Sequence, residues 1–199
     1  MIRPKNVFWD SCCFIRFITR YPELLADMEQ YIKEAREGSI AIHFCTIAFA
    51  EIRPRYFKES AYGSIEEFFD HWGSAFVPID PNANILIEAG RIRDVDPINP
   101  ADPNIADDLK RKVGAADAIH LSACLFLRDA MGLNDIVFHT FDEGKGKTTS
   151  EGKCVPIIGF ERWFPAESRS AVLNEVCSLT RCKPKHYAPD LATGASHGG

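Results

Sequence analysis

Short apolar runs alternate with segments of helical spacing along most of this chain, and this alternation constrains the fold more than any other feature. The runs that read as strands are residues 6–9, 39–44, 75–79 and 135–139, with 155–158 as a candidate fifth strand. The helical segments are residues 11–20, 22–37, 64–72, 82–93 and 115–131. Strands that alternate with helices in this way indicate an α/β fold with a largely parallel sheet.

Individual residues refine several of these elements. Ser64 stands where the helix 64–72 begins, and Thr46 is expected to cap a short helix that carries Glu51. Pro78 favours an edge position for the strand 75–79, because proline cannot donate to a strand ladder.

The length of 199 residues suggests one main domain with an appendage. After residue 164 the composition changes to a short helical stretch, 171–179, followed by a tail rich in Gly, Pro, Ala and Ser. We therefore predict a domain over residues 1–164 and a C-terminal extension over residues 165–199. The last dozen residues of the extension are expected to be disordered, because they offer little apolar surface to bury.

Composition excludes several classes of protein. The longest uncharged apolar run, residues 39–50, is too short to span a bilayer, and the N-terminus does not read as a signal peptide. We therefore expect a cytoplasmic protein without a membrane segment. A net charge of −5 argues against nucleic-acid binding by charge alone. The seven cysteines form no Cys-x-x-Cys pair, which favours reduced thiols over a zinc site.

Four acidic residues stand at positions that a parallel sheet would bring together. Asp10 ends the first predicted strand and Asp142 follows the fourth, while Glu51 and Asp117 lie near the starts of helices. The carboxyl ends of parallel strands share one edge, where ligands bind. Carboxylates crowded there would repel each other, and Mg²⁺ or Mn²⁺ would relieve the repulsion and support displacement at phosphorus. From spacing alone, four unrelated surface acids or helix caps stay an open alternative.

The local sequences around these acids resemble the four motifs of PIN-domain nucleases, in the family order. They are residues 7–11 (Val-Phe-Trp-Asp-Ser), 46–52 (Thr-Ile-Ala-Phe-Ala-Glu-Ile), 116–123 (Ala-Asp-Ala-Ile-His-Leu-Ser-Ala) and 138–142 (Phe-His-Thr-Phe-Asp). The third motif is the most specific, and the resemblance covers about residues 5–160.

The resemblance implies a three-layer α/β/α fold with a central, mostly parallel sheet of four to five strands. It also implies a ribonuclease site in which Asp10, Glu51, Asp117 and Asp142 hold Mg²⁺ or Mn²⁺ and hydrolyse RNA. The commonest compact members are VapC-type toxins of type II toxin–antitoxin pairs. This subclass therefore suggests an RNA substrate, an antitoxin partner and a homodimer.

Two positions beside the first aspartate depart from the family pattern, which often has Thr and then Asn or Ser there. Ser11 still supplies a hydroxyl, and Thr140 is the matching hydroxyl of the fourth motif. Cys12 removes a usual polar group, which keeps a second hypothesis open: a non-catalytic PIN scaffold that only binds RNA or protein. His120, three residues after Asp117, reads either as a structural helix residue or as a hydrogen-bond partner of bound water.

Two further enzyme classes fit less well. Residues 144–149 (Gly-Lys-Gly-Lys-Thr-Thr) resemble the end of a P-loop, but Phe141 replaces the required first glycine. We expect instead a basic loop whose Lys145 and Lys147, together with Arg53, contact RNA phosphates. A phosphatase with an aspartyl nucleophile usually has a second aspartate two residues after the first, where this chain has Cys12.

Overall fold

The computed structural model of the chain describes residues 5–98, 111–144 and 154–186. Its strands are β1 (Asn6–Trp9), β2 (Ala41–Cys45), β3 (Phe76–Ile79), β4 (Val137–His139) and β5 (Arg181–Cys182). Its α-helices are α1 (Ser11–Ile18), α2 (Leu25–Arg36), α3 (Ala48–Glu51), α4 (Ile65–Trp72), α5 (Ala83–Arg93), α6 (Ala115–Asp129) and α7 (Ala171–Ser178). Short 3₁₀ turns are η1 (Pro54–Phe57), η2 (Gly73–Ala75), η3 (Phe160–Trp163) and η4 (Ala166–Ser168).

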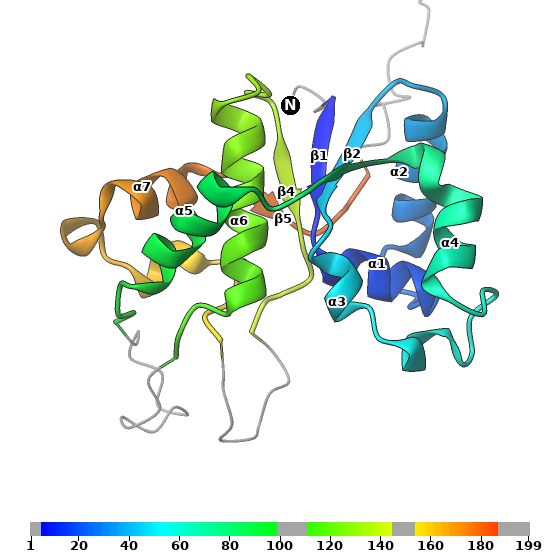
Figure 1. The fold of residues 1–199 in the computed structure, drawn as a ribbon, viewed down its shortest axis with the longest axis horizontal. Coiled ribbons are helices and arrows are strands. Elements are labelled where there is room, and N and C mark those ends of the chain that lie inside the picture. The colour runs from blue at the N-terminus through cyan, green and yellow to red at the C-terminus, as the bar shows by residue number, and fades with distance from the viewer. Residues whose placement is uncertain (1–4, 99–110, 145–153, 187–199) are drawn as a thin grey trace, which may run out of the picture.

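The strands form one sheet in the order β3-β2-β1-β4-β5, and every neighbouring pair is parallel. The central strand β1 pairs with β2 on one side and β4 on the other, so that Val7 is opposite both Ile42 and Val137. Helices α5, α6 and α7 lie on one side of the sheet, and α1 to α4 lie on the other (Figure 1). The predicted α/β fold with three layers is therefore confirmed.

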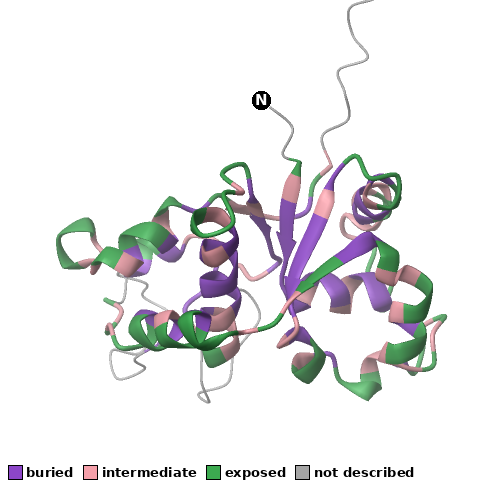
Figure 2. Cartoon of the chain, turned by 45° about the horizontal axis from the view of Figure 1, so that its top comes forward, coloured by how far each residue is buried: buried purple, intermediate pink, exposed green. Residues whose placement is uncertain are grey.

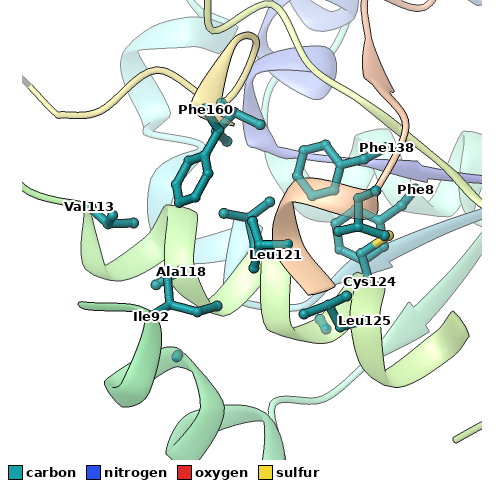
Figure 3. Packing of buried hydrophobic residues seen from close by; sticks show 14 of the residues in the cluster. Phe8, Ile92, Val113, Ala118, Leu121, Cys124, Leu125, Phe138 and Phe160 are labelled. Carbon is teal, nitrogen blue, oxygen red and sulfur yellow. The ribbon is translucent and has the colours of Figure 1, made fainter. Parts of the chain in front are cut away.

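Burial on both faces of the sheet explains why β1 is apolar from Val7 to Trp9. Val7 and Trp9 belong to the core under α1, α2 and α4, while Phe8 belongs to the core under α5, α6 and α7. The strands β2, β1 and β4 are mostly buried in the centre of the molecule, whereas the edge strand β3 is partly exposed, and exposed residues concentrate on the outer helix faces (Figure 2). In the second core, the rings of Phe8 and Phe138 stack with centroids 5.1 Å apart, close to Leu121 of α6 (Figure 3).

Local signals place several element ends as predicted. The Ser64 side chain accepts a hydrogen bond from the Glu67 amide at the start of α4. Asn82 accepts one from the Ile85 amide at the start of α5. Pro78 lies in β3, which is an edge strand. Thr46, in contrast, does not cap α3, because its hydroxyl donates to Asp80 Oδ1 at 2.8 Å.

The fifth strand is not the predicted one. Residues 155–158 form no strand; the Cys154–Lys112 bridge beside them is isolated. The fifth strand is instead β5, which pairs with β4 through Phe138–Arg181 and His139–Cys182. Helix α7 buries Leu173 and Val176 in the core shared with α5 and α6. The described part of the predicted C-terminal extension therefore belongs to the same three layers, while the tail after residue 186 lies outside the described residues.

Membrane insertion through a helix finds no support in the described part of the chain. None of the helices there is both long enough and apolar enough to cross a bilayer.

Candidate functional site

Asp10 and Asp142 follow neighbouring strands at the carboxyl edge of the sheet, at the lower end of β1 and β4 in Figure 1. Trp9 is paired with His139, and the Asp10 amide donates to the His139 carbonyl at 3.3 Å. The sheet order changes direction at β1, since β2 lies on one side of it and β4 on the other. Such a switch point is where α/β folds bind ligands.

Asp10 is held rigidly as the N-cap of α1. Its Oδ1 accepts hydrogen bonds from the backbone amides of Cys12 at 3.1 Å and Cys13 at 3.3 Å. Burial raises the pKa of Asp10 above its ordinary value, although His120, Cys12 and Thr140 lower it in part. A buried carboxylate at this position makes the folded state less stable, and a purely structural helix cap does not require such burial.

Cys12 supplies a polar contact where the sequence suggested a loss. Its thiol donates to Asp10 Oδ1 at 2.8 Å and accepts from the Phe141 amide at 2.9 Å. Its Sγ also lies 3.4 Å from Thr140 Oγ1. The thiol thus links the end of β1 to the segment after β4, and the departure from the family pattern leaves Asp10 anchored.

Glu51 belongs to a three-membered hydrogen-bond cluster. The Ser11 hydroxyl donates a hydrogen bond to Glu51 Oε2, and His120 Nε2 lies 2.9 Å from the same oxygen and 3.0 Å from Ser11 Oγ. Burial alone would raise the pKa of Glu51, but hydrogen bonds from His120 and Ser11 outweigh it, so the pKa is lowered. Glu51 is therefore an ionised acceptor, and His120 Nε2 must carry the proton in their contact.

This cluster is not a serine-nucleophile triad. In such a triad the histidine uses one nitrogen for the serine and the other for the acid. Here Ser11 and Glu51 share Nε2, while Nδ1 is buried without a hydrogen-bond partner among the described residues. The serine proton points to the carboxylate, so the arrangement orients Glu51 and does not activate Ser11.

Asp117 lies in the first turn of α6, close to the other three acids. Burial raises its pKa to about 7, and the charges of Asp142, Asp10 and Glu51 contribute to the increase. A glycine precedes this turn for a steric reason: a Cβ atom on Gly114 would clash with Asp117 Oδ2. Gly114 therefore makes room for the carboxylate.

Asp142 is anchored by backbone amides. Its Oδ1 accepts from the Gly144 amide at 3.1 Å, and its Oδ2 accepts from the Ile157 amide at 3.3 Å. Thr140 Oγ1 accepts from the Asp142 amide at 3.0 Å, so Thr140 supports both this residue and Cys12. Gly144 has a φ of +69°, a conformation that favours glycine.

The four predicted acids lie close enough that the charges of Asp142, Asp10 and Glu51 raise the pKa of Asp117. Ser11 and Thr140 belong to the same site, because Ser11 donates to Glu51 and Thr140 accepts from the Asp142 amide. Of the predicted RNA contacts, Arg53 is exposed just after α3, two residues from Glu51. Lys145 and Lys147 lie outside the described residues.

The four acids, all within the part of the chain that the structure describes, carry the kind of oxygen donors that a hard divalent cation prefers, although no three of them have ligand atoms within 4.8 Å of one another in this structure. Among the described residues, no lysine or arginine forms an ion pair with Asp10, Glu51, Asp117 or Asp142. The pKa values of Asp10 and Asp117 are raised, and a positive charge bound beside them would stabilise their ionised forms. Carboxylate oxygens are the ligands that Mg²⁺ and Mn²⁺ prefer.

A second donor set overlaps the first. One ligand atom each of Asp10, Cys12 and Cys13 lie within 4.8 Å of one another. Burial raises the pKa of both thiols, and the Cys13 thiol donates to the His139 carbonyl at 3.3 Å. Metal-binding cysteines are thiolates. The two thiols therefore serve better as hydrogen-bond donors than as metal ligands. Within this group, Asp10 is the residue suited to bind a metal ion.

No family model, curated protein or solved structure matches the chain. Functional conclusions about this protein therefore depend on the geometry of its own residues and on the four motifs.

Three contributors to the site were missed or undervalued from sequence: the Ile157 amide, Gly114 and the Cys12 thiol. The apolar run 155–158 predicts a strand, whereas in the structure its Ile157 amide donates to the Asp142 carboxylate. Gly114 carried a readable signal, since it immediately precedes the helix that holds Asp117. Nothing in the local sequence indicates the contacts of the Cys12 thiol, which reach across to the segment after β4.

Proposed function

We propose that this protein is a metal-dependent endoribonuclease with a PIN-like site. The observation that carries the proposal is the placement of Asp117 near Asp142, Asp10 and Glu51 at the carboxyl edge of the sheet, where burial and the charges of these acids raise its pKa to about 7. Crowded carboxylates without a cationic side chain are costly in a metal-free protein, and strongly perturbed groups in such a position favour a functional site.

Asp10, Asp117 and Asp142 would hold Mg²⁺ or Mn²⁺, with Glu51 completing the set. A divalent cation bound there would supply an activated water molecule and stabilise the charge that develops at phosphorus during phosphodiester hydrolysis. Two of these side chains have independent supports: amides of α1 hold Asp10, and the Gly144 and Ile157 amides hold Asp142. This preorganisation keeps the acceptor oxygens in place before substrate binds.

Glu51 has a distinct role in this proposal. Because Ser11 and His120 both contact Oε2, that oxygen is held in one orientation. An oriented carboxylate with a lowered pKa can accept a hydrogen bond from the attacking water and direct it toward the phosphate. Arg53, exposed two residues further along the chain, would contact an RNA phosphate near this point.

The narrower proposals come from the motif resemblance alone. They are that the protein is a toxin of a toxin–antitoxin pair, that it binds an antitoxin, that it forms a homodimer and that it acts in the cytoplasm. A neighbouring reading frame that encodes a small DNA-binding protein would support the toxin hypothesis.

The activity is tested with purified protein and a defined single-stranded RNA, in Mg²⁺ or Mn²⁺ and in chelator. We expect cleavage only with metal. Asp10→Asn, Asp117→Asn and Asp142→Asn should each slow cleavage at least about tenfold, a barrier increase of about 1.4 kcal/mol. RNA binding should largely survive, because phosphate contacts come from basic side chains.

Asp80→Asn is the matched control. Asp80 is an exposed acid at the same edge of the sheet, but its carboxylate accepts from Thr46 and is not one of the four acids. This variant should keep the wild-type rate. Cleavage that persists in chelator would refute the metal mechanism, and RNA binding without cleavage under all conditions would favour the non-catalytic scaffold.

A further inference from the structure

A pocket of about 630 Å³ lies between α5, α6 and α7, on the side of the sheet that these helices cover. None of its lining residues is one of the four acids or one of their hydrogen-bond partners described above. Its volume is in the range of pockets that bind small molecules, about 300–1,000 Å³. The pocket is therefore a separate feature that the proposed nuclease activity does not use.

The buried end of this pocket carries an unsatisfied hydroxyl. Ser122 of α6 lines the pocket and is 2% exposed, and its Oγ has no hydrogen-bond partner among the described residues. A buried hydroxyl without a partner makes the folded state less stable. The walls around it are apolar and include Ile85, Leu125, Phe126 and Val172. A ligand with an apolar body and one polar end would satisfy the hydroxyl and cover the walls.

The mouth of the pocket is acidic. Glu88, Asp94, Asp129 and Glu175 line it, against one lining cation, Arg91. Arg91 is already paired with Glu88 at 2.5 Å.

Two of the remaining acids share one cation. Arg128 contacts Asp129 and Glu175, each at 2.6 Å. Asp94 is exposed and has no ion-pair partner among the described residues. The rim thus keeps an excess of negative charge after the arginines are counted, which favours a positively charged group at the open end.

We propose that this pocket binds a small organic cation with an apolar body, whose ammonium group lies at the acidic rim and whose opposite end hydrogen-bonds Ser122. A hydroxyaryl-alkylamine is the chemical class of ligand that has these three parts: an ammonium group, an apolar body and a hydroxyl at the opposite end. The proposal is independent of the nuclease hypothesis, because it is tested by binding alone.

Tyramine is the minimal probe, compared with three close analogues on the full-length, isotope-labelled protein by amide NMR titration. Phenethylamine lacks the hydroxyl, 4-ethylphenol lacks the ammonium, and 3-(4-hydroxyphenyl)propanoate reverses the charge. We expect tyramine to bind with a Kd of about 1 mM or below and to shift amides of α5, α6 and α7. Each neutral or hydroxyl-free analogue should bind about fivefold more weakly, and the propanoate should not bind.

Substitutions in the pocket separate the two polar contacts. Ser122→Ala should weaken tyramine to the level of phenethylamine and leave phenethylamine unchanged. Asp94→Asn should weaken both amines and leave 4-ethylphenol unchanged. Because Ser122 Oγ has no partner in the described structure, Ser122→Ala should not lower the melting temperature.

Two tryptophan substitutions on α7 test whether tyramine binds in this pocket. Ala171→Trp places a large side chain at an exposed pocket residue, whereas Asn174→Trp lies exposed on the same helix outside the lining. The first should abolish tyramine binding and the second should not. Three results would each overturn the proposal. They are no tyramine binding at about 10 mM, which is about ten times the expected Kd, equal binding of all four probes, and tyramine binding that Ala171→Trp leaves unchanged.

Discussion

The Nε2 atom of His120 lies 2.9 Å from Oε2 of Glu51, although the two residues come from helices on opposite sides of the sheet. Helix α3 packs its Ala48 into one core, and α6 packs Leu121 into the other. The contact therefore joins the two outer layers over the carboxyl end of the strands. Its position suggests that His120 acts by holding Glu51.

Replacement of His120 tests this positioning role. His120→Ala should slow RNA cleavage about tenfold, because Glu51 loses one of its two side-chain donors. His120→Gln should recover much of the rate, since its amide nitrogen can donate from a similar place. Metal affinity, measured by calorimetry, should change little in either variant. Equal rates in both variants would argue against the hydrogen bond.

Gly114→Ala should reduce activity without unfolding the protein. The added Cβ would clash with Asp117 Oδ2, and the cheapest response is rotation of the Asp117 carboxylate away from its place. We expect at least about a tenfold loss of cleavage rate, equal to about 1.4 kcal/mol in the barrier. Gly73→Ala is the matched control, because a Cβ there would meet nothing within 4 Å.

Asp117→Asn should stabilise the metal-free protein at neutral and higher pH. The folded protein raises the pKa of Asp117 from 3.8 to about 7, so this group favours the fold below pH 3.8 and loses that contribution as the pH rises through 7. The full shift corresponds to at most about 4 kcal/mol, and solvent screening reduces the expected gain to about 1 kcal/mol. Chemical denaturation in chelator at pH 8 and pH 4 measures it. A gain of the same size at both pH values would contradict this explanation.

His139 should make the protein less stable in mild acid. Burial lowers its pKa from 6.5 to about 3, so its contribution is complete above pH 6.5 and is lost as the pH falls toward 3. At pH 5 the loss is about 2 kcal/mol relative to pH 8. His139→Phe removes the titrating group while keeping a ring beside Tyr31, whose centroid lies 5.0 Å away. The difference in unfolding free energy between wild type and variant should therefore change between pH 8 and pH 5.

Much of the fold could be predicted because it depends on short-range patterns. The strand Asn6–Trp9 is apolar at every position that the sheet buries, and its bounds follow from the sequence. Ser64 and Asn82 start their helices as side-chain caps, an interaction within three residues. Pro78 indicated an edge strand because its missing N–H excludes a central one. These features need no knowledge of distant segments.

Other features depended on contacts between segments far apart in the chain. The sequence predicts the fifth strand at residues 155–158 because this run is apolar, whereas the structure has it at Arg181–Cys182 beside β4. The short pair forms the strand because α7 packs against α5 and α6 and brings it there. The thiol of Cys12, the Ile157 amide and the orientation of Glu51 are likewise set by partners on other elements. Sequence determines which acids can reach the carboxyl edge, because strand and helix ends are local. The hydrogen bonds that hold them there, and the burial that raises the pKa of Asp117, exist only after the layers have packed.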